Sequence, residues 1–108
     1  MATYLETLDA FNEKKNTQGG KLIVIDFTAT WCPPCQGISP LVGELAEAGT
    51  ASGEYEVYKV DGDKNPEACE AISLEGFPTF KFYKDGAEVD QMVGANKDKL
   101  KELIAKHK

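Results

Sequence analysis

The chain has 108 residues and a mass of 11.8 kDa, the size of one domain, so these residues leave no room for a second domain with a core of its own. Twelve basic residues, all of them lysines, stand against eighteen acidic ones, and the net charge is −6. Because phosphate binding needs clustered positive charge and base reading relies on the arginine fork, this composition argues against nucleic acid as a partner.

Membrane spans and targeting signals are not expected either. The longest apolar stretch, Leu22–Phe27, contains Asp26 and is far shorter than the about 20 apolar residues that a membrane helix needs. The first eight residues lack the basic and apolar regions of a secretory signal, and the last residues form no retention or lipidation signal. We expect one domain spanning residues 1–108, in the cytoplasm and away from membranes.

The first half of the chain alternates between helical and strand patterns. Thr7 is a suitable N-cap for a short helix that ends at the breaker cluster Asn16–Gly20. The run Leu22–Phe27 is rich in β-branched residues and is typical of a strand buried on both faces of a sheet. Apolar residues then recur at helical spacing over residues 38–46, where Pro40 is expected to bend the helix.

The second half predicts a hairpin between two further helices. The expected elements are a strand at Tyr55–Val60, a helix opening at Pro66, strands at Thr79–Tyr83 and Ala87–Val93, and a final helix capped by Asn96. Asp85-Gly86 is a strong hairpin signal, so the last two strands should be antiparallel neighbours. Cys69 is expected to be a small buried residue on the inner face of its helix. Together the elements predict an α/β fold, a small mixed sheet with helices on both faces.

The segment Trp31-Cys32-Pro33-Pro34-Cys35 follows a buried strand and opens a helix. Two cysteines at this spacing can bring their Cα atoms within the roughly 4.4–6.8 Å that a disulfide requires. The first cysteine faces the helix N-terminus, where unpaired N–H groups and the helix dipole stabilise a thiolate. We therefore predict a Cys32–Cys35 redox pair, in which Cys32 is the nucleophile and Cys35 resolves the mixed disulfide.

Metal sites and bound cofactors are weaker interpretations. Zinc needs four ligands, and only Cys69 and His107 remain as further candidates, on separate predicted helices. Residues 61–65 resemble the start of a calcium loop, yet Pro66 and Ile72 stand where glycine and a bidentate acid are required. No glycine-rich nucleotide motif occurs. We expect no metal and no cofactor, and electrons must then come from a separate protein.

Asp26 is an acid inside an apolar strand, where a carboxylate pays a desolvation penalty. One interpretation places it at the rim of the sheet, satisfied by a lysine or by water. The other, which the strand position favours, is a buried acid of raised pKa that exchanges a proton with the Cys35 sulfur.

Several short segments spread over nearly the whole chain form one recognisable set: Val24–Phe27, Ala29–Cys32 with Cys35, Pro40, Lys59–Asp61 with Asp63, Gly76–Thr79 and Val93–Ala95. Together they resemble the thioredoxin family, and Gly94–Lys97 with Lys99-Leu100 is closer to its eukaryotic members. The resemblance implies the thioredoxin fold, with the element order β-α-β-α-β-α-β-β-α. It also implies that the protein is a monomer that reduces protein disulfides by dithiol–disulfide exchange. Its substrates would be disulfide-containing proteins, including a peroxiredoxin, and a thioredoxin-reductase-like flavoenzyme would re-reduce it.

The resemblance also assigns roles to individual residues. Asp26 matches the buried proton donor and acceptor, and Lys59 matches its partner on a neighbouring strand. Pro78 matches a proline preceded by a cis bond, which would hold the backbone of Phe77 open to pair with an extended substrate segment. The substrate groove would be lined by Trp31, Gly76, Phe77, Pro78, Gly94 and Ala95.

The active-site loop departs from the usual family pattern. Pro33-Pro34 replaces the common Gly-Pro and resembles tryparedoxin and nucleoredoxin; Pro33 stiffens the loop but also removes a possible N–H donor to the thiolate. Gln36 stands where lysine is common, which removes a nearby positive charge. Two alternative functions stay open: a dedicated tryparedoxin-like or nucleoredoxin-like reductant of a peroxidase, and a redox-dependent binding module that docks partners around Trp31 and Pro78.

Overall fold

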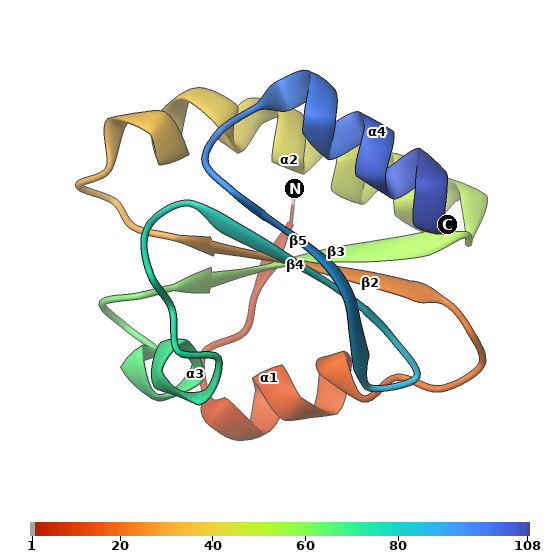
Figure 1. Ribbon diagram of the computed structural model, residues 1–108, viewed down its shortest axis with the longest axis horizontal. Coiled ribbons are helices and arrows are strands. Elements are labelled where there is room, and N and C mark those ends of the chain that lie inside the picture. Colours follow the sequence, from red (N-terminus) through yellow and green to blue (C-terminus); the bar gives the residue numbers. More distant parts are fainter. Residues whose placement is uncertain (1) are drawn as a thin grey trace.

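The computed structural model describes residues 2–108. Its elements are β1 (Thr3–Tyr4), α1 (Leu8–Lys15), β2 (Leu22–Thr28), α2 (Pro33–Ser52), β3 (Tyr55–Asp61), α3 (Pro66–Ala71), β4 (Thr79–Lys84), β5 (Ala87–Val93) and α4 (Lys97–His107). The strands form one mixed sheet in the order β1-β3-β2-β4-β5. Figure 1 shows α2 and α4 on one face of this sheet and α1 and α3 on the other. The predicted α/β architecture and its element order are confirmed.

Strand β2 lies at the centre of the sheet. It runs parallel to β3 on one side and antiparallel to β4 on the other, and all seven of its residues are buried. A strand covered by helices on both faces has no solvent side, which explains why Leu22–Phe27 is a nearly continuous apolar run rather than an alternating one. The carboxyl end of β2 leads directly into the cysteine loop, so the central strand positions that loop.

The two faces of the sheet pack separate hydrophobic cores. On one face, Ile38 and Val42 of α2 and Leu100 of α4 pack with inward residues of β2, β3 and β4. On the other face, Phe11 of α1 packs edge-to-face against Phe27, with ring centroids 5.7 Å apart. Within residues 2–108, no helix is both long and apolar enough to cross a membrane.

Turn and cap residues set the ends of the elements. Thr7 and Asn96 accept backbone hydrogen bonds as the N-caps of α1 and α4, as predicted. Asp85 and Gly86 have φ values of 52° and 85°, the left-handed pair that a two-residue hairpin turn requires, and they join the antiparallel strands β4 and β5. Pro40 lies within α2, which continues to Ser52.

The prediction for Cys69 was wrong in one respect. The residue is on α3 and contacts the core beneath that helix, but its side chain is only partly buried. It also lines a surface groove with Pro66, Glu70 and Leu74, which leaves it partly exposed.

Candidate active site

Cys32 and Cys35 form a disulfide at the N-terminus of α2, with Cα atoms 5.3 Å apart. Cys32 is the N-cap residue, and its Sγ accepts a hydrogen bond of 3.3 Å from the backbone N–H of Cys35. Both side chains are buried, with exposed fractions of 4% and 1%. The sulfur atoms therefore lie at the positive end of a helix and just below the surface, where a thiolate is stabilised.

The two prolines of the loop begin the helix. Pro33 and Pro34 occupy its first two positions, where the missing N–H groups would have had no partner within the helix. Because an N-cap side chain accepts from the second or third helical residue, Pro34 leaves Cys35 as the donor to the Cys32 sulfur.

Gln36 holds the loop against the first turn of α2. Its side-chain amide donates to the backbone carbonyl of Ala29 at 3.1 Å, and the N–H of Cys32 donates to the same carbonyl at 3.3 Å. A neutral side chain thus takes a structural position in which a lysine would add positive charge beside the sulfur. Gln36 therefore lacks the positive charge with which a lysine at this position would stabilise the thiolate.

Asp26 lies within β2, between Lys59 of β3 and Phe80 of β4, and only 1% of it is exposed. Its Oδ1 has no hydrogen-bond partner. Burial raises the pKa of Asp26 to about 7, against the opposing effect of the Lys59 charge. The first interpretation of Asp26, a rim acid satisfied by lysine or water, does not fit this position; a buried acid that titrates near neutral pH does.

Lys59 is beside Asp26 in the parallel register of β2 and β3, but its ammonium points to other partners. Its Nζ donates to Ser39 Oγ of α2 at 2.9 Å and lies 5.2 Å from the centre of the Tyr4 ring. Lys59 therefore acts on Asp26 through its charge. The sequence offered no signal for Ser39 or Tyr4 here, because both contacts depend on how α2 and β1 pack against β3.

The loop before β4 forms the opposite wall of the site. The peptide bond between Phe77 and Pro78 is cis, and the Pro78 carbonyl accepts the N–H of Gly94 at 2.8 Å. Phe77 packs against the cluster of Ala29, Cys32 and Cys35. Gly62 has no Cβ that could overlap the Phe77 ring, which explains why glycine fits that position.

An exposed aromatic side chain forms the outer rim. Trp31 is 64% exposed, and its ring stands edge-to-face on Phe77 with centroids 5.5 Å apart. Its indole N–H donates to Asp63 Oδ2 at 3.0 Å. Asp63 was part of the family resemblance but had no predicted role, because a contact between residues so far apart in sequence leaves no local pattern.

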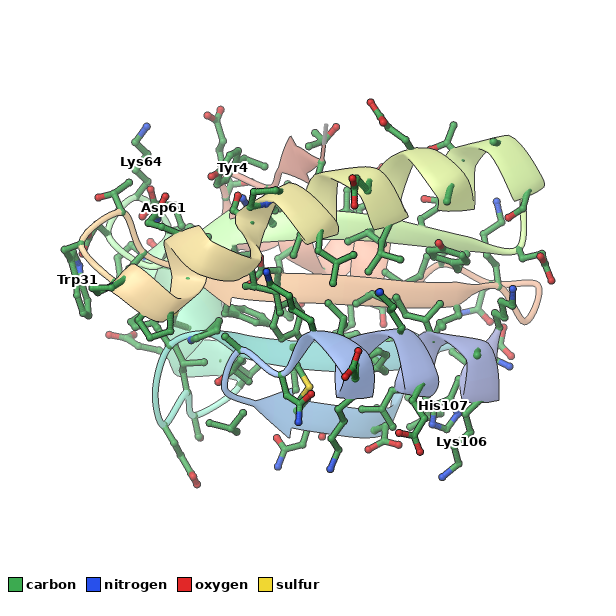
Figure 2. All side chains as sticks on the ribbon, turned by 90° about the horizontal axis from the view of Figure 1, so that it is seen from above. Tyr4, Trp31, Asp61, Lys64, Lys106 and His107 are labelled. Atoms are coloured by element: carbon green, nitrogen blue, oxygen red, sulfur yellow. A yellow bond between two sulfur atoms is a disulfide. The ribbon has the colours of Figure 1, made fainter. Side chains whose placement is uncertain are left out.

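Of the predicted groove residues, Trp31 and Phe77 have contacts that place them at the disulfide. Phe77 contacts the cysteine cluster and Trp31, and the Gly94 loop is hydrogen-bonded to Pro78; Gly76, Gly94 and Ala95 are partly buried. Figure 2 shows Trp31 near Asp61 and Lys64 at one end of the molecule and His107 at the other. His107, considered above as a zinc ligand, has its Nε2 atom 2.9 Å from Oδ2 of Asp90. Across residues 2–108, no group of three or more histidine, cysteine or acidic side chains is arranged to hold a metal ion.

Comparisons with known proteins agree with this geometry. A family model described as Thioredoxin matches residues 3–106. A thioredoxin of Geodia cydonium is 44% identical over 109 residues, covering all of both chains. The crystal structure of Fasciola hepatica thioredoxin superimposes with a TM-score of 0.90 at 45% identity, covering 98% of this chain and 99% of that one. Another similar chain comes from a structure titled for thiol resolution in a yeast mitochondrial 1-Cys peroxiredoxin via glutathione/thioredoxin systems, with a TM-score of 0.85, 30% identity and coverage of 97% and 94%.

Proposed function

This chain belongs to the thioredoxin family and is a thiol–disulfide oxidoreductase, and on that premise we propose that it is a general reductant of protein disulfides in the cytoplasm, acting as a monomer. The observation that carries the proposal is the Cys32–Cys35 disulfide at the N-terminus of α2, with the Phe77 side chain packed against it and Trp31 packed on Phe77. The cytoplasm supplies the reducing conditions in which such a dithiol is regenerated.

The proposed reaction has two exchanges. The Cys32 thiolate attacks one sulfur of a substrate disulfide, forms a mixed disulfide and releases the first substrate thiolate. Cys35 loses its proton and attacks the Cys32 sulfur, which releases the second substrate thiolate and leaves the Cys32–Cys35 disulfide. Two electrons pass from the dithiol to the substrate, and a pKa of about 7 lets Asp26 take up the Cys35 proton at neutral pH.

The groove is proposed to hold the substrate in an extended conformation. The Phe77 side chain packs against the cysteine cluster, and the resemblance to the family assigns the Phe77 backbone the pairing with an extended segment. Trp31, Gly76, Gly94 and Ala95 would border that segment. In this arrangement main-chain hydrogen bonds provide binding without selecting particular side chains, which suits a reductant with many substrates.

The electron donor and the range of substrates can be tested in one coupled assay. We expect NADPH oxidation when a thioredoxin reductase, this protein and insulin are present together, and background rates when any one is omitted. If no NADPH is oxidised, but this protein reduces insulin fully when a small dithiol replaces the reductase and NADPH, the proposed electron donor is contradicted. Insulin left unreduced under both conditions would contradict the general reductant.

A second candidate function is favoured by Pro33-Pro34, which resembles tryparedoxin and nucleoredoxin. In that case the protein would be a dedicated reductant of a peroxidase, and a low-molecular-weight dithiol would re-reduce it. The solved relative from the peroxiredoxin study makes a peroxiredoxin a sensible first substrate. Replacing insulin by a peroxiredoxin in the coupled assay separates the two functions, because a dedicated reductant would turn over the peroxiredoxin and leave insulin unchanged.

A further inference from the structure

A surface groove lies between α3 and the loop that precedes β4. Its volume is about 350 Å³, and its lining includes Pro66, Cys69, Glu70, Leu74 and Phe77. The Phe77 side chain also packs against the cluster that contains Cys32 and Cys35. Phe77 therefore contacts both the groove and the cysteine cluster, and a substrate segment that leaves the cysteine pair on this side would pass Phe77 and enter the groove.

The groove combines an apolar floor with an acidic edge. Pro66, Leu74 and Phe77 supply apolar surface, and the exposed Glu70 stands beside them. Between positions 61 and 75 the chain has five carboxylates and one lysine, Lys64. Within residues 2–108, Glu70 takes part in no ion pair, and neither do the exposed Glu67 and Glu75. The negative charge at this edge is thus uncompensated by the protein itself.

Two further carboxylates, at the end of β3 and just after it, add negative potential at Cys69, which lines the groove. Burial raises the pKa of its thiol, and the carboxylates of Asp61 and Asp63 raise it further. A neighbouring negative charge that disfavours a thiolate favours a cation at the same place. The protonated Cys69 thiol is also a poor competitor for disulfide exchange beside Cys32.

We propose that this protein prefers disulfide substrates with a lysine or arginine close to the reacting cysteine, held in the α3 groove. The inference rests on the proposed reductant function. A lysine or arginine has an aliphatic stem and a charged end, so its stem can lie on Leu74 and Phe77 while its cation reaches Glu70. A second copy of this chain is a poor occupant, because it would bring another acidic surface against the first.

The test uses three disulfide-linked peptides that differ only at the position two residues from the cysteine. That position holds lysine, alanine or glutamate. We expect the reduced protein to react with the lysine peptide about 5- to 10-fold faster than with the glutamate peptide at low ionic strength, and the alanine peptide to lie between them. In 0.5 M salt, where the screening length is about 4 Å, the ratio should fall below about twofold.

Two single variants locate the effect. Glu70→Gln should at least halve the lysine-to-glutamate ratio, whereas Glu102→Gln should leave it unchanged. Glu102 is an exposed acid of α4, on the opposite face of the sheet from α3, and its replacement changes the net charge by the same amount (Figure 1).

The outcomes distinguish this inference from the function on which it rests. Equal rates for all three peptides would overturn the preference and leave the reductant function standing. A ratio that falls equally in both variants would assign the effect to net charge and overturn the groove. Failure to reduce any of the peptides would contradict the proposed function instead.

Discussion

Replacing Cys32 with serine is expected to reduce insulin reduction to the rate of dithiothreitol alone, because the attacking thiolate at the N-cap of α2 is removed. Replacing Cys35 should stop the reaction half-way. The first exchange still occurs, but no second thiol can attack the Cys32 sulfur, so a mixed disulfide with the substrate accumulates. Insulin precipitation measures the first effect, and mass spectrometry of the non-reduced protein measures the second.

Cys69→Ser is the matched control, since it removes the third thiol and keeps the Cys32–Cys35 pair. It should accumulate no mixed disulfide. Undiminished insulin reduction by Cys32→Ser would contradict the assignment of the nucleophile, and an adduct that forms through Cys69 would contradict the assignment of the redox pair.

Asp26→Asn is expected to stabilise the fold and to do so increasingly as the pH rises. The folded pKa of about 7 lies above the ordinary value of 3.8, so the folded protein binds this proton more tightly than the unfolded chain. The contribution of the Asp26 carboxyl to the wild-type free energy of unfolding is therefore greatest below about pH 4 and declines until the pH passes 7. A shift of about three pKa units corresponds to roughly 4 kcal/mol in the free energy of unfolding at pH 8.

Urea unfolding of the oxidised proteins at pH 4 and pH 8 measures this difference. The gain in Asp26→Asn should be near zero at pH 4 and largest at pH 8. Asp90→Asn is the control of opposite sign: the hydrogen bond from His107 lowers the pKa of Asp90, so its stabilising effect is present above its unfolded pKa and is lost as the pH falls. A pH-independent gain, or a loss of stability, in Asp26→Asn would contradict the raised pKa.

The same variant separates a role in proton transfer from a purely structural one. We expect Asp26→Asn to slow the reduction of substrate by about tenfold or more at pH 7 and to remove the rate dependence that titrates near that pH. A group that only shaped the fold would change stability and leave the pH profile of the rate unaltered.

Much of the fold could be predicted because its signals are local. The run Leu22–Phe27 indicates a strand buried on both faces whatever its neighbours are, and Asp85-Gly86 indicates a hairpin from two residues. The cysteine pair needed only its position between a strand and a helix. Asp26 was found for the same reason, since one acid in an apolar strand stands out without any knowledge of its contacts.

The remaining features of the site depend on contacts between distant segments. The Lys59 ammonium bonds to Ser39, and the Trp31 indole bonds to Asp63, and neither contact leaves a pattern at either residue. The partial exposure of Cys69 follows from the surface groove that it lines, which helical periodicity cannot predict.

The midpoint potential of the Cys32–Cys35 couple tests the proposed direction of electron flow most directly. It is obtained by equilibrating the protein in dithiothreitol or glutathione buffers and measuring the fraction of free thiols. A reductant of protein disulfides requires a strongly reducing couple, with a potential similar to that of thioredoxin, which is about −270 mV. A potential near about −120 mV, where the disulfide is a strong oxidant, would show that electrons flow from substrate to protein and would contradict the proposed function.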